Sequence, residues 1–296
     1  MRKRFAIAVA AALLVGWQVR ATPEGVAQFV SATKWHQSDD WFGGFSGIEV
    51  LDGGNSFVAI SDRGHIVQGT FARDADQIAD ISIDQDHQIL GLKGEVQKRF
   101  RRDTEGLAIR NDGRLYVSFE GYHRVWAYMS VGAQAAGIQR HVDFKTMANN
   151  GSLEALAVDD NNHLYTLPED PSTSDGSIPV YRYAQGEWTN PFNLPNSSSY
   201  HPVGADFGPD GKFYLLERGF NGFGFKTRVR RFEIKAEGAT AEEMLLQTST
   251  GVHDNLEGIS VWKDDQGRIR LTMVSDDNFM FYQRTEIVEY LLPDSA

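Results

Sequence analysis

Carboxylate side chains recur at equivalent positions of a hairpin pattern that is repeated along this chain. Glu105, Glu154 and Glu257 each open a short apolar run that predicts a β-strand, and a turn rich in Asn, Asp and Gly follows each run. A second strand-forming run follows each turn and also ends in a carboxylate. Because the first strand of an antiparallel hairpin begins beside the end of the second, these acids should gather on one rim.

The ends of the second strands supply further acids to that rim: Asp62, Glu120, Glu169, Glu217 and Asp276. So many carboxylates in one place repel one another, and a cation, protonation or pairing with arginine would relieve the repulsion. Arg63 and Arg218 each follow one of these acids directly. They can pair with the acids or hold an anionic substrate.

The donor types favour a hard cation at this rim. The chain has no cysteine and no closely spaced histidine pair, so oxygen ligands predict Ca²⁺, or else Mg²⁺, before zinc. Asn255 and Asn278 flank the last repeat and could add neutral oxygen ligands, although asparagine is also common in turns. The predicted metal ligands are therefore Glu105, Glu154, Glu257, Asn255 and Asn278.

A structural role for the three first-strand glutamates is the alternative, since each could cap backbone N–H groups of a neighbouring unit. The first and fourth repeats have Ser46 and Val203 at the same position. A purely structural requirement would recur in every repeat. No Gly-x-Ser-x-Gly motif surrounds Ser46, and the chain has neither a phosphate-binding glycine loop nor a dinucleotide fingerprint.

The elements that must position the acids repeat with a period near fifty residues. The opening positions are 46, 105, 154, 203 and 257, with spacings of 59, 49, 49 and 54. Short strands at such a period predict an all-β fold, a β-propeller with five blades. The last repeat supplies only three strands, and a strand predicted over 26–35 would complete it and hide both sheet edges. A sixth blade could occupy the stretch 84–102.

Two local features complete the expected secondary structure. The run 138–144 should form the fourth strand of the second repeat, and 241–246 should form a short helix.

The N-terminus predicts export. Arg2-Lys3-Arg4 precedes an apolar run that ends at Trp17, and small residues suit cleavage after Ala21. The run falls short of the roughly 20 residues that a membrane-spanning helix needs. We therefore expect a signal peptide over 1–21, a single domain over 22–296, and a periplasmic or secreted protein with no membrane span after cleavage.

Composition limits the partners. The chain has 296 residues, of which 41% are hydrophobic, so it can bury a large core without disulfides. Loss of the signal, with its four basic residues, would take the formal charge from −11 to −15. This charge argues against nucleic acid as a partner and leaves a small anionic substrate held through a cation or arginine.

Several segments of the chain resemble the phytase-like family, also called esterase-like activity of phytase. They are Ser61-Asp62-Arg63-Gly64, Thr104-Glu105-Gly106-Leu107-Ala108, Leu153-Glu154-Ala155-Leu156-Ala157, Leu216-Glu217-Arg218, Asp254-Asn255-Leu256-Glu257-Gly258 and Ser275-Asp276-Asp277-Asn278-Phe279. The resemblance runs from about position 45 to the end. It implies an exported bacterial propeller whose acidic residues form a phosphoester-hydrolysing site, with Val203 leaving that site incomplete at the fourth repeat.

The leading hypothesis is an exported metal-dependent hydrolase that acts on a phosphoester, as a phosphatase or phosphodiesterase. In it, the second-strand acids serve as further ligands or proton acceptors, and Arg63 and Arg218 stabilise the anion. Two alternatives remain open. One is a non-catalytic propeller that binds a ligand or partner and contains a structural calcium ion, and the other is a metal-dependent lactonase or carboxylesterase.

Overall fold

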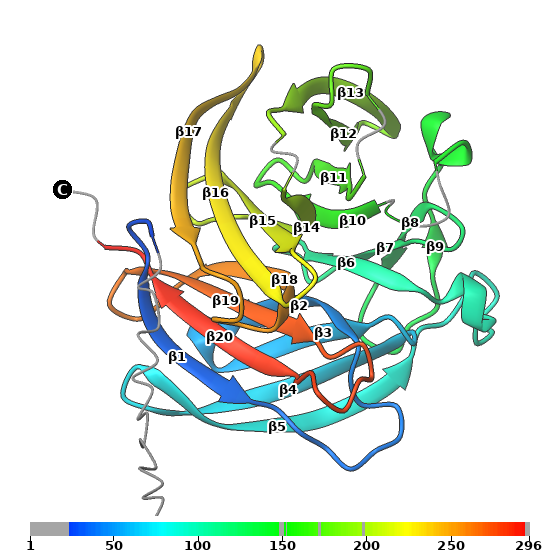
Figure 1. The fold of residues 1–296 in the computed structure, drawn as a ribbon. Helices are drawn as coiled ribbons and strands as arrows, with labels where there is room; N and C mark the ends of the chain where they lie inside the picture. Colours follow the sequence, from blue (N-terminus) through cyan, green and yellow to red (C-terminus); the bar gives the residue numbers. More distant parts are fainter. Residues whose placement is uncertain (1–23, 148–150, 152, 171–172, 197–198, 294–296) are drawn as a thin grey trace, which may run out of the picture.

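The computed structural model describes residues 24–147, 151, 153–170, 173–196 and 199–293. Within these residues, five four-stranded antiparallel sheets are arranged radially around an axis (Figure 1). The predicted five-bladed β-propeller is confirmed. The predicted signal peptide lies outside the described residues. In the part of the chain that is described, no helix has the length and apolar character needed to cross a bilayer.

Blades 1 to 4 take their strands in chain order from the axis outward, and blade 5 takes its outermost strand from the N-terminal end of the described chain. Blade 1 consists of β2 (Phe45–Leu51), β3 (Ser56–Ser61), β4 (His65–Asp74) and β5 (Gln77–Gln88), and blade 2 of β6 (Thr104–Ile109), β7 (Leu115–Phe119), β8 (Arg124–Tyr128) and β9 (Ala136–Gly137). Blade 3 consists of β10 (Leu153–Val158), β11 (Leu164–Pro168), β12 (Ile178–Ala184) and β13 (Glu187–Leu194), and blade 4 of β14 (His201–Phe207), β15 (Phe213–Phe220), β16 (Phe225–Lys235) and β17 (Gly238–Gln247). Blade 5 consists of β18 (Asn255–Lys263), β19 (Ile269–Asp276), β20 (Glu286–Leu291) and β1 (Gln28–Lys34). Three short 3₁₀ helices lie between strands: η1 (Asp52–Gly54), η2 (Arg99–Arg101) and η3 (Asp143–Lys145).

The N-terminal strand closes the ring as predicted. β1 pairs antiparallel with β20, from Gln28 opposite Leu291 to Lys34 opposite Glu286. Its backbone groups therefore cover the edge that blade 5 would otherwise expose.

Three local predictions are wrong. The run 138–144 is not a strand, because β9 pairs with β8 only briefly and the chain then turns to bury Phe144. The run 241–246 is not helical, because β16 recruits it into β17. The stretch 84–102 forms no sixth blade: β5 extends into it as far as Gln88, and a loop with η2 follows.

The hydrophobic core consists of five clusters, and each fills the space between two neighbouring blades. Blades 3 and 4 share Leu167 and Phe213, for example, whereas blades 5 and 1 share Trp262 and Phe57. Because every blade packs on both neighbours, apolar burial holds the ring closed all the way round.

Glycines let the five first strands meet at the axis. The residue after each opening position is Gly47, Gly106, Ala155, Gly204 or Gly258. A Cβ on Gly204 would overlap the Glu257 carbonyl oxygen, and one on Gly258 would lie 2.9 Å from the Gly47 Cα atom. Only a cavity of about 10 Å³ remains between these strands. The ring centre is therefore packed protein at the level of these strands.

Gly204→Ala should consequently lower the free energy of unfolding by about 1 to 3 kcal/mol, because backbone atoms of the next blade would have to move. Gly137→Ala, whose new Cβ meets only Leu92 at 3.5 Å, should change it by less than about 0.5 kcal/mol. Urea unfolding of both variants measures the difference. Equal stability would mean that the first strands do not need this close approach.

Two carboxylates face each other across the axis on the far side of this packed centre. Glu49 of β2 accepts a hydrogen bond from the Ser260 hydroxyl at 3.2 Å, and Asp206 of β14 accepts one from the Val261 N–H at 2.6 Å. Burial raises the pKa of Asp206 to about 7. Burial and repulsion from Asp206 also raise the pKa of Glu49 well above its usual range.

The folded protein therefore binds protons at this pair more tightly than the unfolded chain does, and this contribution to stability is lost as pH rises from about 4 through about 7. Removing one of the two acids with Glu49→Gln should make the fall in melting temperature between pH 5 and pH 8 smaller. Each unit by which the pKa of a group is higher in the folded than in the unfolded protein contributes about 1.4 kcal/mol to this pH-dependent stability, so the effect should be measurable. The buffers should contain EDTA. The surface variant Glu187→Gln should keep the wild-type slope, and a slope that Glu49→Gln leaves unchanged would contradict the pairing.

Candidate functional site

A β-bulge in each first strand directs one side chain toward one end of the axis. In all five blades the pairing of the first strand with the second shifts around the opening position, as between Leu153 and Ala155 or between Leu256 and Gly258. A bulge re-aims the side chain it contains. Glu105, Glu154 and Glu257 therefore leave the strand alternation and converge at one mouth of the ring, as their positions predicted.

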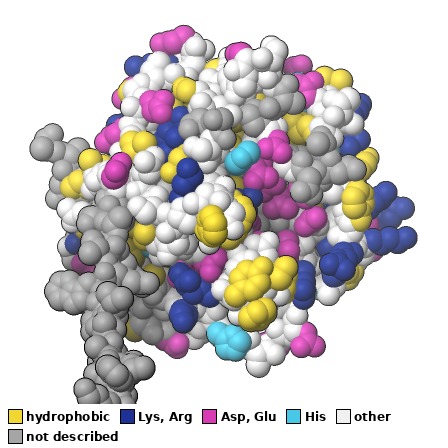
Figure 2. Space-filling view, viewed as in Figure 1, with side chains coloured by type: hydrophobic (Ala, Val, Ile, Leu, Met, Phe, Trp, Pro, Cys, Tyr) yellow, Lys and Arg dark blue, Asp and Glu magenta, His cyan; other side chains and the backbone are white. Residues whose placement is uncertain are grey.

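These glutamates belong to a group of acids that we call the acidic recess, which comprises Asp62, Asp103, Glu105, Glu120, Glu154, Glu169, Glu257 and Asp276. Figure 2 shows acidic side chains gathered in a hollow of this face, with hydrophobic and basic side chains next to them. The electrostatic contacts among the acids extend from Asp62 in blade 1 to Asp276 in blade 5.

The tightest group in the recess lies on blade 2. Carboxylate oxygens of Asp103, Glu105 and Glu120 lie within 4.8 Å of one another. Glu105 is buried and, among the described residues, accepts no hydrogen bond, whereas Glu120 accepts one from the Gly151 N–H at 2.7 Å. Three like charges thus face one another with little compensation.

Burial and mutual repulsion make the recess hard to ionise. They raise the pKa of Glu105 and of Glu154 well above the usual range, with burial as the main cause and neighbouring carboxylates next. Burial and repulsion from Asp103 raise the pKa of Asp62 to about 7. Burial and repulsion from Glu257 raise the pKa of Asp276 to about 9. The recess therefore takes up protons or a cation readily.

Arg218 neutralises the opposite side of the recess. From β15 its guanidinium forms ion pairs with Glu169 of blade 3 and Glu257 of blade 5, and it donates a hydrogen bond to the Asn255 side-chain oxygen at 2.9 Å. The Asn255 amide also donates to Glu257 at 2.8 Å. Because these partners occupy both Arg218 and Asn255, Glu105 and Glu154 form no ion pair among the described residues, although the charge of Arg218 partly offsets the rise in the Glu154 pKa.

Arg63 lies at the rim on the blade 1 side. Its guanidinium stacks 3.1 Å from the centroid of the Phe279 ring and donates to the Asp40 carbonyl oxygen at 3.1 Å. Its charge partly offsets the repulsion that raises the Asp62 pKa. Arg63 is therefore placed where it can meet an anion that enters the recess.

Two predicted site residues have other roles. Glu217 lies outside the recess: its fully buried carboxylate receives hydrogen bonds from Arg228 and Arg230, at 2.7 to 2.8 Å. The reason is geometric, because alternation along β15 sends neighbouring side chains in opposite directions, and Arg218 is the one that reaches the recess. Asn278 lies at the edge of the recess, where its backbone N–H donates to Asp276 at 2.6 Å.

Asp103 was missed by the sequence reasoning. Among the five repeats, only the second has a carboxylate two residues before its opening position, and this feature could have identified Asp103 as a site residue. Its contact with Glu120 follows from the hairpin, because Asp103 precedes β6, Glu120 follows β7, and Thr104 lies opposite Phe119. The backbone Glu120 N–H donates to the Asp103 carbonyl oxygen at 3.0 Å, which brings the two acids together.

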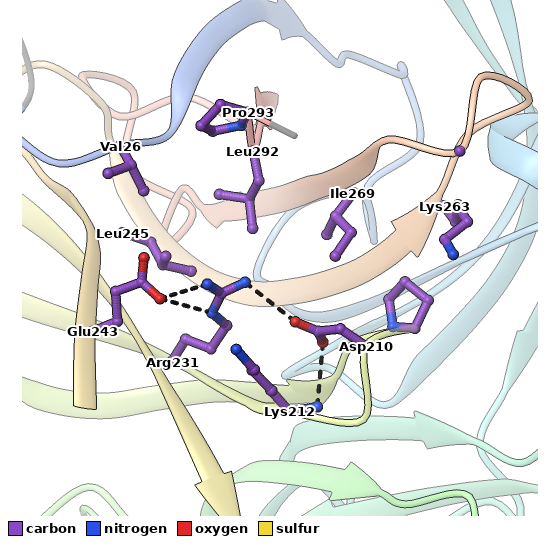
Figure 3. A pocket seen from close by; sticks show the side chains of 12 residues that line it. Val26, Asp210, Lys212, Arg231, Glu243, Leu245, Lys263, Ile269, Leu292 and Pro293 are labelled. Atoms are coloured by element: carbon purple, nitrogen blue, oxygen red, sulfur yellow. Dashed lines mark hydrogen bonds and ion pairs between the residues drawn. The ribbon is translucent and has the colours of Figure 1, made fainter. Parts of the chain in front are cut away.

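A cavity of about 430 Å³ lies away from the recess, in the groove between blades 4 and 5 (Figure 3). Its main charged groups satisfy one another, since Arg231 pairs with both Asp210 and Glu243. Val26, Leu245, Ile269 and Leu292 supply apolar lining. Lys212 and Lys263 also line this groove, so it lacks the excess of carboxylates that marks the acidic recess.

Comparisons with known proteins agree with this fold. The endo-arabinase from Bacteroides thetaiotaomicron is 14% identical over 92% of this chain and 99% of its own, with a TM-score of 0.50. The PQQ-bound aldose sugar dehydrogenase from Streptomyces coelicolor is 13% identical over 91% of this chain and 99% of its own, with a TM-score of 0.47. At 14% identity the likeness to the endo-arabinase shows the fold alone. No curated protein matches the sequence.

A family model identifies the chain more closely. The model of the phytase-like family, described as esterase-like activity of phytase, matches residues 40–279. This range contains all eight acids of the recess together with Arg63 and Arg218, and the match supports a hydrolase-type propeller. The chain belongs to the phytase-like family.

Proposed function

We propose that this protein is an exported, metal-dependent hydrolase that acts on a phosphoester in the acidic recess. The observation that carries the proposal is the set of closely spaced carboxylates at Asp103, Glu105 and Glu120, none of which forms an ion pair among the described residues. The periplasmic or secreted location rests on the N-terminal sequence. Family membership supports a hydrolase, and the choice of a phosphoester rests on how a cation and Arg63 would meet an anion.

The donor set suits a hard divalent cation. Oxygens that bind Ca²⁺ lie 2.3 to 2.6 Å from the ion, so ligands of one ion are at most about 5 Å apart. The oxygens of Asp103, Glu105 and Glu120 meet this limit, and Glu154 is the carboxylate whose repulsion raises the Glu105 pKa most. These residues would hold Ca²⁺, or else Mg²⁺. A bound cation would polarise a phosphoryl oxygen and make a water molecule more acidic.

The other residues of the recess would orient the substrate and move protons. Arg218 is held by Glu169 and Glu257, so it fixes the wall of the recess rather than serving as a mobile anion clamp. Arg63, which stacks on Phe279 and donates to the Asp40 carbonyl oxygen but forms no ion pair among the described residues, would meet the phosphoester from the rim. In the cation-free recess, burial and neighbouring carboxylates raise the pKa of Asp276 to about 9 and that of Asp62 to about 7, so these two acids would be the ones to donate a proton to a leaving oxygen and to accept one.

Hydrolysis of p-nitrophenyl phosphate, bis(p-nitrophenyl) phosphate and phytate by the mature protein tests the reaction. We expect turnover of at least one of them with Ca²⁺, Mg²⁺ or Mn²⁺ and its loss in EDTA. Glu105→Gln should lower kcat/KM by about 100-fold or more, because a ligand carboxylate is removed. Glu187→Gln, which removes one exposed carboxylate from the outer strand β13, should retain wild-type activity.

The alternatives predict different results. Cation-dependent hydrolysis of carboxylic esters or lactones with no phosphoester turnover would identify a lactonase or carboxylesterase. Calcium binding with no turnover of any ester would identify a binding propeller with a structural ion. Either result would overturn the proposed phosphoester hydrolase.

Stability gives an independent test of the cation. Calcium at a hundredfold excess over its Kd should add about 2.7 kcal/mol, which corresponds to a rise in melting temperature of about 5 °C or more. The rise should be absent in Glu105→Gln and intact in Glu187→Gln. Equal melting temperatures in EDTA and in millimolar Ca²⁺ at neutral pH would return the glutamates to a structural role.

A further inference from the structure

A cavity of about 420 Å³ adjoins the acidic recess on the side of blades 4 and 5, and we call it the side cavity. It is lined by Glu169, Ser199, His201, Arg218, Phe220, Phe225, Asn255 and Asn278. Glu169 belongs to both, so a molecule bound at the recess can extend into the side cavity. Its volume lies in the range of pockets that hold small organic ligands.

The charged groups that line the side cavity are already paired. Arg218 is held by Glu169 and Glu257, and the His201 Nδ1 atom lies 3.1 Å from an Asp170 carboxylate oxygen. An ionic ligand group placed here would have to compete with these partners. The side cavity therefore suits an uncharged part of a ligand, in contrast to the acidic recess beside it.

Two aromatic rings form the apolar wall. Phe220 and Phe225 are opposite each other at the end of the β15–β16 hairpin, with ring centroids 5.0 Å apart and a tilt of 42° between the rings. Phe220 is 62% exposed, although a large apolar side chain gains from burial. Such ring faces pack well against another aromatic ring, and the ring–ring interaction contributes binding free energy in addition to that of area burial. Ser199 and Asn278 supply polar groups at the edges.

We propose that the side cavity binds an aromatic ring in the organic part of the ester, with Phe220 and Phe225 as its specificity-determining residues. This inference rests on the proposed function, since the phosphate of the same molecule would occupy the acidic recess. The preferred substrates would then be aryl-bearing phosphoesters, whereas a phosphoester whose organic part is small and polar would leave the aromatic wall uncovered.

Binding of two non-hydrolysable probes tests this without relying on turnover. Calorimetric titration with 1-naphthylmethylphosphonate and with methylphosphonate, both in saturating Ca²⁺, should show that the naphthyl compound binds at least about tenfold more tightly. Phe220→Ala should abolish this preference and leave methylphosphonate binding unchanged. Phe223→Ala is the matched control: Phe223 lies in the same hairpin, is 97% exposed and does not line the side cavity, so the preference should persist.

The outcomes separate the inference from the proposed function. Equal binding of the two probes, or a preference that survives Phe220→Ala, would overturn the aromatic site even if phosphoesters are hydrolysed. A naphthyl preference that depends on Phe220, in a protein that hydrolyses no ester, would support the side cavity and overturn the hydrolase. Failure of both probes to bind would overturn the assignment of the side cavity.

Discussion

The close approach of five first strands at the axis is the constraint on which the rest of this structure depends. Gly204 and Gly258 permit it, because a side chain at either position would overlap a neighbouring strand. The bulge just before each of these glycines turns the preceding side chain toward the mouth of the ring. Ring closure and the concentration of negative charge thus have a common origin, since the strands cannot meet without bringing their opening residues together.

The acids of the recess are paired with cations unequally. Arg218 compensates Glu169 and Glu257, whereas Asp103, Glu105 and Glu120 have no comparable cation beside them within the described chain. Outside the recess, Glu217 is paired fully with Arg228 and Arg230, whereas the buried acids Glu49 and Asp206 accept hydrogen bonds from neutral groups. Within the recess, the acids without an ion pair thus lie on one side, and this is where a cation would gain most from binding.

The recess and the side cavity differ in chemistry although they share Glu169. One is dominated by carboxylates with raised pKa values, and the other by paired charges and the rings of Phe220 and Phe225. A substrate with a charged end and an aromatic end would match both. Blade 4 supplies Val203 instead of a glutamate at its opening position, so the acids are fewest on the side where the aromatic wall begins.

The sequence by itself determined the repeat, the five blades, the closing N-terminal strand and the rim on which the acids gather, because hairpins are specified by local alternation and turn residues. Tertiary structure alone decided which acids are paired with arginine. It turned Glu217 toward Arg228 and Arg218 toward Glu169 and Glu257, because those contacts depend on how side chains point between strands and blades. It also drew 241–246 into β17, since pairing with β16 outweighs local helix propensity.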